Sequence, residues 1–282
     1  MNLPIQHHYL SEFHLLGFTD ENGGLSVFDK LRGDVGIRRS TPKKEFTQRH
    51  LNTFTIQDGT KNVDLERWYA KEIEAPAALV VKKLITAARL HEAPSVLTFD
   101  ERSDWLNFVN HQRKRPPDAF ERVGCLQDIA RQVAEAIARL ENKVGRALTA
   151  EERAIVESPD GKKRMIQQAK IGARGDGSKI VLDVLANKGL ALGLVKKPNK
   201  SFIFGDYPFV KAGRSVELAD PQTEYWVPIA SDVIVGSVGE VGRDYFTIIS
   251  ADQVRMINKV IFKQSNKVAA RSEMLIRSLA RL

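Results

Sequence analysis

The hydrophobic and polar positions in the middle of the chain predict a run of helices. Their expected ranges are 64–90, 98–115, 118–143 and a fourth from 149 onward. Thr98 with Glu101 forms a capping box, in which a hydroxyl and a carboxylate satisfy free backbone amides at a helix start. Pro76 predicts a kink or break in the first helix, because proline has no backbone N–H to donate.

The rest of the chain predicts strands, most of them in the carboxy-terminal half. The expected strands are 25–30, 50–56, 190–195, 201–204, 226–229 and 233–236. Residues 5–18 are expected to form a short strand that leads into a helical turn and packs on the carboxy-terminal sheet. A last helix should begin at Ser250, where Gln253 completes a capping box, and run towards Leu279.

Together these elements predict a single α+β domain over residues 1–282. Its middle is helical, and its β-rich carboxy half is closed by a long basic helix. Residues 144–178 are expected to form a peripheral insertion, because a basic loop at 158–164 and the glycines of 172–177 interrupt the helical pattern.

Composition narrows the class of protein. With 282 residues and 43% hydrophobic content the chain can bury a full core, and its single cysteine, Cys125, excludes a disulfide framework and suits a reducing cytoplasm. We expect Cys125 to be a buried structural thiol. No signal peptide and no membrane span are expected. The net charge of +8 favours nucleic acid as a partner, although a soluble protein can also simply be basic.

Histidines cluster near the start of the chain, where His7, His8 and His14 are three of only six. Two imidazoles in one site can cleave a phosphodiester, one taking a proton from the attacking hydroxyl and one giving a proton to the leaving oxygen. With Glu and Asp they could instead hold a divalent metal, the only cofactor that the sequence suggests. The alternative is that these histidines hydrogen-bond within the buried start of the fold.

Two carboxylates are the best acidic candidates. Glu74 lies beside Pro76 on the predicted helix, two turns from Glu66, for which a solvated face is expected. Asp206 follows a predicted strand, a position typical of functional sites. Its alternative role is to close the end of that strand with an Asx-turn.

Cations recur every four residues along the predicted last helix, and such a stripe can neutralise the phosphates of a nucleic-acid backbone. The residues are Arg255, Lys259, Lys263, Lys267 and Arg271. Asn258 lies on the apolar side of the stripe, where a buried amide needs partners, and we expect it to contact the amino-terminal segment. The alternative is the solvated face of an amphipathic helix. Motifs for ATP, for NAD and for lipase-type catalysis are missing from the sequence.

The start of the chain resembles the amino-terminal signature of a bacterial family, domain of unknown function 4238. In that signature a His-His-Tyr-Val-Pro run precedes an aromatic residue, a leucine and a closing phenylalanine. The matching residues are His7, His8, Tyr9, Phe13, Leu15 and Phe18. Ser11 replaces the proline and Leu16 replaces a common arginine. Weaker similarity continues at 24–30, 65–66, 73–74, 202–208, 225–229 and 257–258, so that it spans roughly 5–275.

The family resemblance implies no settled activity, only a loose expectation of a toxin or phage-defence effector. In the second half, this chain departs from the family pattern at Gly205, Tyr207, Ala230 and Ser231.

Two functions are therefore predicted. In the first, the protein is a phosphodiesterase acting on RNA or DNA. Its candidate residues are His7 or His8 as acid or base, Tyr9 to orient the phosphate, Glu74 and Asp206 as partners or metal ligands, and Lys259, Lys263 and Lys267 on the backbone. In the second, the protein is a non-catalytic module that binds nucleic acid, an acidic protein or a second copy of itself.

Overall fold

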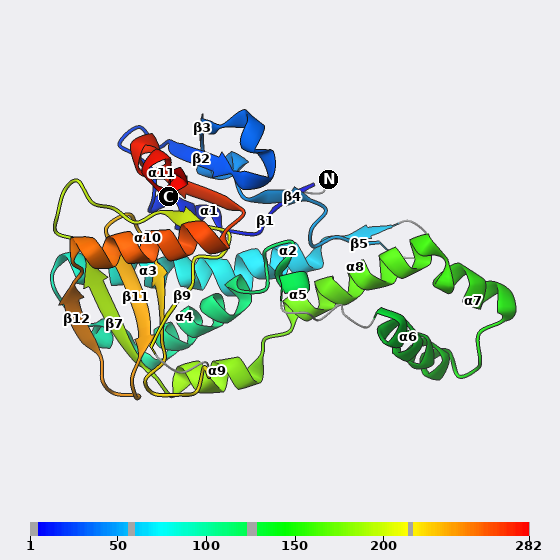
Figure 1. Ribbon diagram of the computed structural model, residues 1–282. Helices are drawn as coiled ribbons and strands as arrows, with labels where there is room; N and C mark the ends of the chain where they lie inside the picture. The colour runs from blue at the N-terminus through cyan, green and yellow to red at the C-terminus, as the bar shows by residue number, and fades with distance from the viewer. Residues whose placement is uncertain (1–4, 56–59, 123–128, 214–216, 282) are drawn as a thin grey trace.

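The computed structural model describes residues 5–55, 60–122, 129–213 and 217–281 (Figure 1). Cys125 and Ile56, for which a buried thiol and a strand end are predicted, lie outside these residues. The described elements form an α+β fold, as predicted. Within the described ranges, no helix combines the length and the apolar character needed to cross a bilayer.

A five-stranded sheet forms the carboxy-terminal half, in the order β12-β7-β11-β10-β9. Its strands are β7 (Gly189–Leu194), β9 (Val210–Ala212), β10 (Glu224–Pro228), β11 (Val233–Val238) and β12 (Tyr245–Ile248). Every neighbouring pair is antiparallel except β12 and β7. The predicted strands at 190–195, 226–229 and 233–236 are thereby confirmed.

Helices cover both faces of this sheet. On one face α3 (Ala75–Arg89) and α4 (Phe99–Gln112) bury apolar residues such as Leu84 and Trp105 against β7 and β11. On the other face lies α10 (Ala251–Gln264), with Ile257 and Ile261 in a second core (Figure 1). The capping boxes predicted for α4 and α10 are both present, because the two partners of each box are only three positions apart in the sequence.

The helix before α3 changes its winding. It begins as α2 (Asp64–Trp68), widens to a π-helical turn, η3 (Tyr69–Glu74), and continues as α3. Pro76 cannot donate to the carbonyl of Glu72, four residues earlier, and a wider turn accommodates the lost hydrogen bond. The irregularity predicted at Pro76 is therefore present just before it, and it places Glu74 at the end of the wide turn.

A four-stranded sheet, β3-β2-β13-β8, joins the two ends of the chain. Its strands are β2 (Leu25–Asp29), β3 (Ile37–Ser40), β8 (Phe204–Gly205) and β13 (Lys267–Ala270). The predicted continuous helix from Ser250 towards Leu279 is wrong: α10 ends at Gln264, β13 follows, and α11 (Glu273–Ala280) comes last. Val268 and Ala269 are fully buried and pair with β2 and β8, so sheet contacts override the helical spacing of the cations.

The amino-terminal segment packs on the five-stranded sheet, as predicted. It comprises β1 (Gln6–His8), which pairs with β4 (Thr47–Arg49), and α1 (Glu12–Leu16). The Nε2 of His14 is 2.9 Å from the carbonyl oxygen of Pro228 on β10, and the carbonyl of Gly17 accepts from the Ser231 amide at 2.7 Å. A side chain at Gly17 would place its Cβ 2.5 Å from the Ile229 carbonyl, so only glycine permits this approach.

The strand predicted at 50–56 is mostly wrong. His50 has a φ of 57°, in the left-handed region, and strand pairing resumes only in β5 (Phe54–Thr55), opposite β6 (Lys61–Asn62). The strand predicted at 201–204 shrinks to β8. The local pattern of these segments resembles that of strands, but a turn and a short pairing partner limit them.

Three helices project as an arm from one end of the molecule (Figure 1). They are α6 (Ile129–Val144), α7 (Ala150–Glu157) and α8 (Pro159–Gly175). The sequence predicts one helix over 118–143, and the structure describes α5 (Ala119–Arg122) and α6 there. The segment predicted as a basic loop is the first turn of α8, capped by Ser158. The far end of α8 returns to the core, where the Arg174 guanidinium donates to the Leu51 carbonyl at 3.2 Å, and α9 (Lys179–Ala186) follows.

Candidate functional site

His7 lies in the interior, where it holds a loop. It is fully buried, and its Nδ1 accepts a hydrogen bond from the backbone amide of Asn52 at 3.0 Å. The carboxylate of Glu66 is 3.7 Å from the same nitrogen and accepts from the Asn52 side chain at 2.8 Å. Glu66 thus faces the signature segment, whereas the sequence analysis expected it on a solvated helix face. These contacts make His7 a positioning residue of the fold.

On one side of the amino-terminal segment lies a group that we call the Glu74 flank. It consists of His8, Ser11, Glu74 and Arg115. The Ser11 hydroxyl donates to a carboxylate oxygen of Glu74 at 2.7 Å, and the same oxygen forms an ion pair with the Arg115 guanidinium. Arg115 also donates to the backbone carbonyl of His8 at 2.5 Å. The segment that carries the histidines is therefore tied to the π-helical turn through one arginine.

Charge pairing controls the ionisation of Glu74. Burial alone would raise the pKa of its carboxyl, but the charge of Arg115 and the hydrogen bonds from Arg115 and Ser11 outweigh burial and hold that pKa below its ordinary value. Arg115 itself is only 1% exposed and stacks 4.5 Å from the ring centre of Tyr69. Glu74 is thus the ionised partner of a buried cation at neutral pH. The sequence analysis missed Arg115, because a cation at a helix end is common without such a role.

The other flank, the Asp206 flank, comprises Tyr9, Asp118, Arg122, Asp206 and Tyr207. Asp206 directly follows β8 and is 4% exposed. Its two oxygens accept from the backbone amides of Asn266 and Lys267 at 3.0 and 3.2 Å. Burial raises the pKa of Asp206 to about 6 against the effect of these two hydrogen bonds, and Asp118 raises it further. This carboxyl therefore changes its protonation near neutral pH.

The solvent side of this flank is a cluster that the sequence analysis did not identify. Asp118 accepts from the Tyr207 hydroxyl at 2.8 Å and from the Arg122 guanidinium at 2.7 Å. The Arg122 guanidinium lies 3.9 Å from the ring centre of Tyr207. The side chains of Asp118 and Arg122 are each about one third exposed, at 34% and 33%, so Arg122 can meet a ligand. The pair Asp118 and Arg122 has the i,i+4 spacing of a helical ion pair, which was the available sequence signal.

Tyr9 belongs to the Asp206 flank. It is 6% exposed and packs edge-on against Phe46, with ring centres 5.9 Å apart. Burial, with the carboxylates of Asp206, Asp29 and others around it, raises the pKa of Tyr9 well above its ordinary value. The hydroxyl of Tyr9 thus stays protonated and can donate.

The predicted catalytic residues do not meet in one open cleft. His8 and Glu74 lie on one flank, Tyr9 and Asp206 lie on the other, and His7 is buried. Gln112 holds the segment between them by donating to the Tyr9 carbonyl at 2.7 Å. Among the described residues, no group of three or more His, Cys, Asp or Glu side chains is arranged to hold a metal ion.

Two members of the predicted nucleic-acid set lie elsewhere than expected. Lys267 is in β13, with its amine 3.6 Å from Asp29 and 3.5 Å from Glu45. Asn258 is buried and bonds the Ile203 amide and the Ser201 carbonyl at 3.0 and 2.9 Å, not the amino-terminal segment. Both side chains are engaged inside the protein, which is a correction to their predicted role on a nucleic-acid backbone.

Three cations of the predicted stripe, Arg255, Lys259 and Lys263, remain exposed on α10. Arg271, the last member, is also exposed, and it lies between β13 and α11.

Comparison with known proteins supplies a family and nothing finer. A family profile described as a protein of unknown function (DUF4238) matches residues 6–273. A search of curated proteins and a search of solved structures each found no significant match.

Proposed function

The chain belongs to the DUF4238 family of proteins of unknown function, and from the geometry of its Asp206 flank we propose that it cleaves phosphodiester bonds in nucleic acid. The observation that carries the proposal is the grouping at the end of the Asp206 flank, where the buried Asp206 lies beside the partly exposed Asp118–Arg122 ion pair and Tyr207. Burial raises the pKa of Asp206 to about 6. A group that titrates near the working pH can both accept and return a proton, which general acid–base catalysis requires.

The neighbours of Asp206 have the chemistry that a phosphodiester needs. The guanidinium of Arg122, held by Asp118, would bind a phosphate oxygen, and the Tyr9 hydroxyl would donate to the same group. Asp206 would take the proton from the attacking hydroxyl or water. These roles move the centre of the reaction from the histidines to the end of β8.

His8 supplies a second proton-transfer group in this proposal. Its ring is partly exposed, with Nε2 3.4 Å from the Pro42 carbonyl, and its backbone is held by Arg115. Glu74 acts through Arg115 to position the segment, and His7 does so through Asn52. We assign these two to positioning because Glu74 is the counter-ion of the buried Arg115 and His7 is fully buried.

The test is cleavage of labelled single-stranded RNA and DNA, with and without Mg²⁺ or Mn²⁺, by the wild type and by Asp206→Asn. We expect the substitution to lower the rate by about a hundredfold or more, the usual contribution of a general acid or base. It should also remove a step in the pH–rate profile near the pKa of Asp206, about 6. His8→Ala and Tyr9→Phe should lower the rate by smaller factors.

Asp160→Asn is the matched control, because Asp160 is exposed on the arm and the charge change is the same. Equal cleavage by the wild type and by folded Asp206→Asn would contradict the assignment of Asp206. Because cleavage of a host's nucleic acid is toxic, we extend the proposal to a toxin or phage-defence effector. In that case expression of the wild type should slow growth, and Asp206→Asn should relieve it.

A second function, a non-catalytic binding module, is favoured by one observation. The polar atoms of His7, Glu74 and Asn258 are engaged in internal bonds, while the cations of α10 are free to meet a partner. A binding module of this kind should bind nucleic acid more weakly as the salt concentration rises, and neither the wild type nor any variant should cleave it.

A further inference from the structure

Three adjoining hollows surround the exposed side of α10. The first, of about 680 Å³, lies between α10, α11 and the loop 198–201. The second, of about 540 Å³, lies at the far end of the helix beside Lys30 and Phe262. A third hollow on α10 shares Arg255 with the first and Lys259 with the second. The three hollows therefore neighbour one another along the helix, and we call them together the α10 groove.

The charge of the α10 groove is strongly one-sided. Its cations are Lys30, Lys200, Arg255, Lys259, Lys263 and Arg271, and its one acidic residue is Asp252. None of the six cations forms an ion pair within 4 Å with a carboxylate of the described part of the chain. The amine of Lys30 instead donates to the Phe262 and Lys263 carbonyls.

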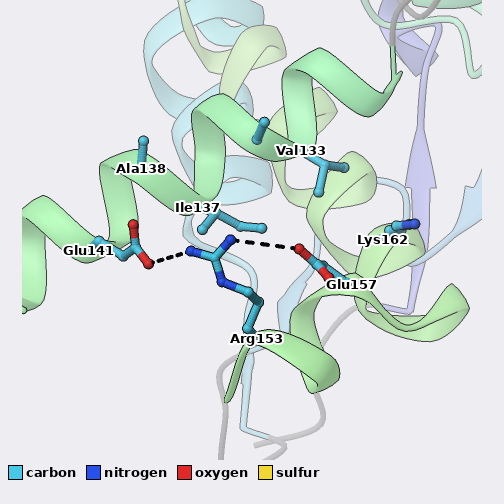
Figure 2. A pocket seen from close by; sticks show the side chains of 8 residues that line it. Val133, Ile137, Ala138, Glu141, Arg153, Glu157 and Lys162 are labelled. Atoms are coloured by element: carbon cyan, nitrogen blue, oxygen red, sulfur yellow. Dashed lines mark hydrogen bonds and ion pairs between the residues drawn. The ribbon is translucent and has the colours of Figure 1, made fainter. Parts of the chain in front are cut away.

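A hollow in the arm shows the opposite arrangement. It has about 410 Å³ and lies between α6, α7 and α8, where Arg153 bridges Glu141 and Glu157 at 2.8 and 4.0 Å (Figure 2). Two acids thus neutralise the arginine in the arm. The α10 groove has no such pairs, so its cations are available to an external anion.

We propose that the α10 groove binds single-stranded nucleic acid. Along α10 the cations Arg255, Lys259 and Lys263 rise by about 6 Å per step, a regular spacing that suits the repeated phosphates of a strand. The same hollows are lined by the exposed Met256 and Met274 and the partly buried Phe262, apolar side chains that can contact unstacked bases. A duplex hides its bases from such a surface, so the mixture of cations and apolar side chains favours a single strand.

The groove also leads to the Asp206 flank. At the end of α10 the side chain of Gln264 donates to the carbonyl oxygens of Tyr207 and Phe209 at 2.6 and 2.9 Å. The guanidinium of Arg122 donates to the Gln264 carbonyl at 2.6 Å. A strand lying along α10 would therefore reach Arg122 at its end. The identification of a single strand as the substrate rests on the proposed function. Binding of the strand to the α10 groove does not require that the strand be cleaved.

The test is fluorescence anisotropy with a labelled single strand of about 20 nucleotides, the same sequence as a duplex, and a poly-glutamate peptide. The full chain and Lys259→Gln/Lys263→Gln are titrated over a salt series. We expect the double variant to bind the single strand about tenfold more weakly. The salt dependence should fall by about 1.4 in logarithmic slope, since each phosphate contact contributes about 0.7.

The matched control is Lys143→Gln/Lys163→Gln, which removes the same charge from exposed positions on the arm. Circular dichroism establishes that both double variants fold. Equal weakening by the two double variants would overturn the proposal, since net charge alone would then explain binding. Tighter binding of the duplex or of poly-glutamate would overturn it as well, the latter in favour of an acidic protein partner.

Measuring binding and cleavage separately distinguishes this inference from the proposed function. If the wild type binds the single strand but does not cleave it, the proposed phosphodiesterase activity is wrong and binding in the α10 groove stands. If the wild type cleaves and Lys259→Gln/Lys263→Gln binds the strand as tightly as the wild type does, the groove proposal is wrong and the phosphodiesterase stands.

Discussion

Each flank of the amino-terminal segment holds one carboxylate, the partly buried Glu74 or the buried Asp206, and the pKa values of the two shift in opposite directions. On one flank Arg115 lies against Glu74 and holds its pKa below the ordinary value. On the other, Asp206 has two backbone amides but no guanidinium in contact, and its pKa rises to about 6. Burial raises the pKa in both cases, so the presence of a contacting cation decides the outcome.

The difference separates a carboxylate held in an ion pair from one without a contacting cation. Glu74 remains charged because it stabilises a buried arginine, and any proton on it would cost that ion pair. Asp206 retains the freedom to exchange a proton. We infer that the segment is anchored on the Glu74 flank so that chemistry can take place on the Asp206 flank.

The largest expected effect comes from breaking the anchor. Glu74→Ala leaves the guanidinium of Arg115, which is 1% exposed, without its counter-ion, and we expect a loss of about 3–5 kcal/mol in the free energy of unfolding. Urea denaturation measures this loss. The double variant Glu74→Leu/Arg115→Met should recover most of it, because apolar residues of similar volume can replace a buried ion pair. A double variant as unstable as the single one would show that the ion pair is not the cause.

A smaller effect should appear as pH dependence on the Asp206 flank. The native state binds the Asp206 proton up to a pH of about 6, whereas the ordinary pKa is 3.8, so the native state holds more protons between these values. The free energy of unfolding should therefore fall as pH rises through this window, by at most about 3 kcal/mol. Asp206→Asn should remove this slope, as measured by urea denaturation at several pH values.

Glu74 sharpens the same comparison, because its pKa is lowered and its contribution has the opposite sign. Its stabilisation is present above the ordinary pKa and is lost as pH falls. If Asp206→Asn has the same pH profile as the wild type while Glu74→Gln changes it, then Asp206 does not titrate as proposed.

The smallest effect is expected for Ser11→Ala. It removes one hydrogen bond to the Glu74 carboxylate but leaves the ion pair with Arg115, so roughly 1–2 kcal/mol should be lost. Thermal unfolding beside Ser26→Ala, a buried serine on β2, provides the control. A loss as large as that of Glu74→Ala would mean that Ser11, rather than Arg115, holds this flank.

The sequence predicted best those features that depend on neighbouring residues. The capping boxes at Thr98 and Ser250 were both predicted, because each depends on residues only three positions apart. Features that depend on distant partners were missed. Lys267 continued the four-residue spacing of α10, and only pairing with β2, more than two hundred residues earlier, makes it part of a strand.

The residues of the candidate site were likewise predicted where the signal was local and missed where it depended on distant partners. Glu74 and Asp206 were singled out from their local contexts, but Arg115 and the cluster of Asp118, Arg122 and Tyr207 were not. Their roles arise where segments far apart in the sequence meet, as when Tyr207 donates to Asp118. The periodicity of the sequence carries no information about contacts between such distant segments.

The position of β13 has a consequence for how the protein is made. This strand lies between β2 and β8, so the sheet that begins near residue 25 lacks its inner strand until residue 270 has been synthesised. During translation β2 therefore presents an unpaired edge while nearly the whole chain emerges from the ribosome, and such edges invite pairing with other chains. Closing so long a loop is slow, and a nascent chain of this kind is one that a chaperone would protect.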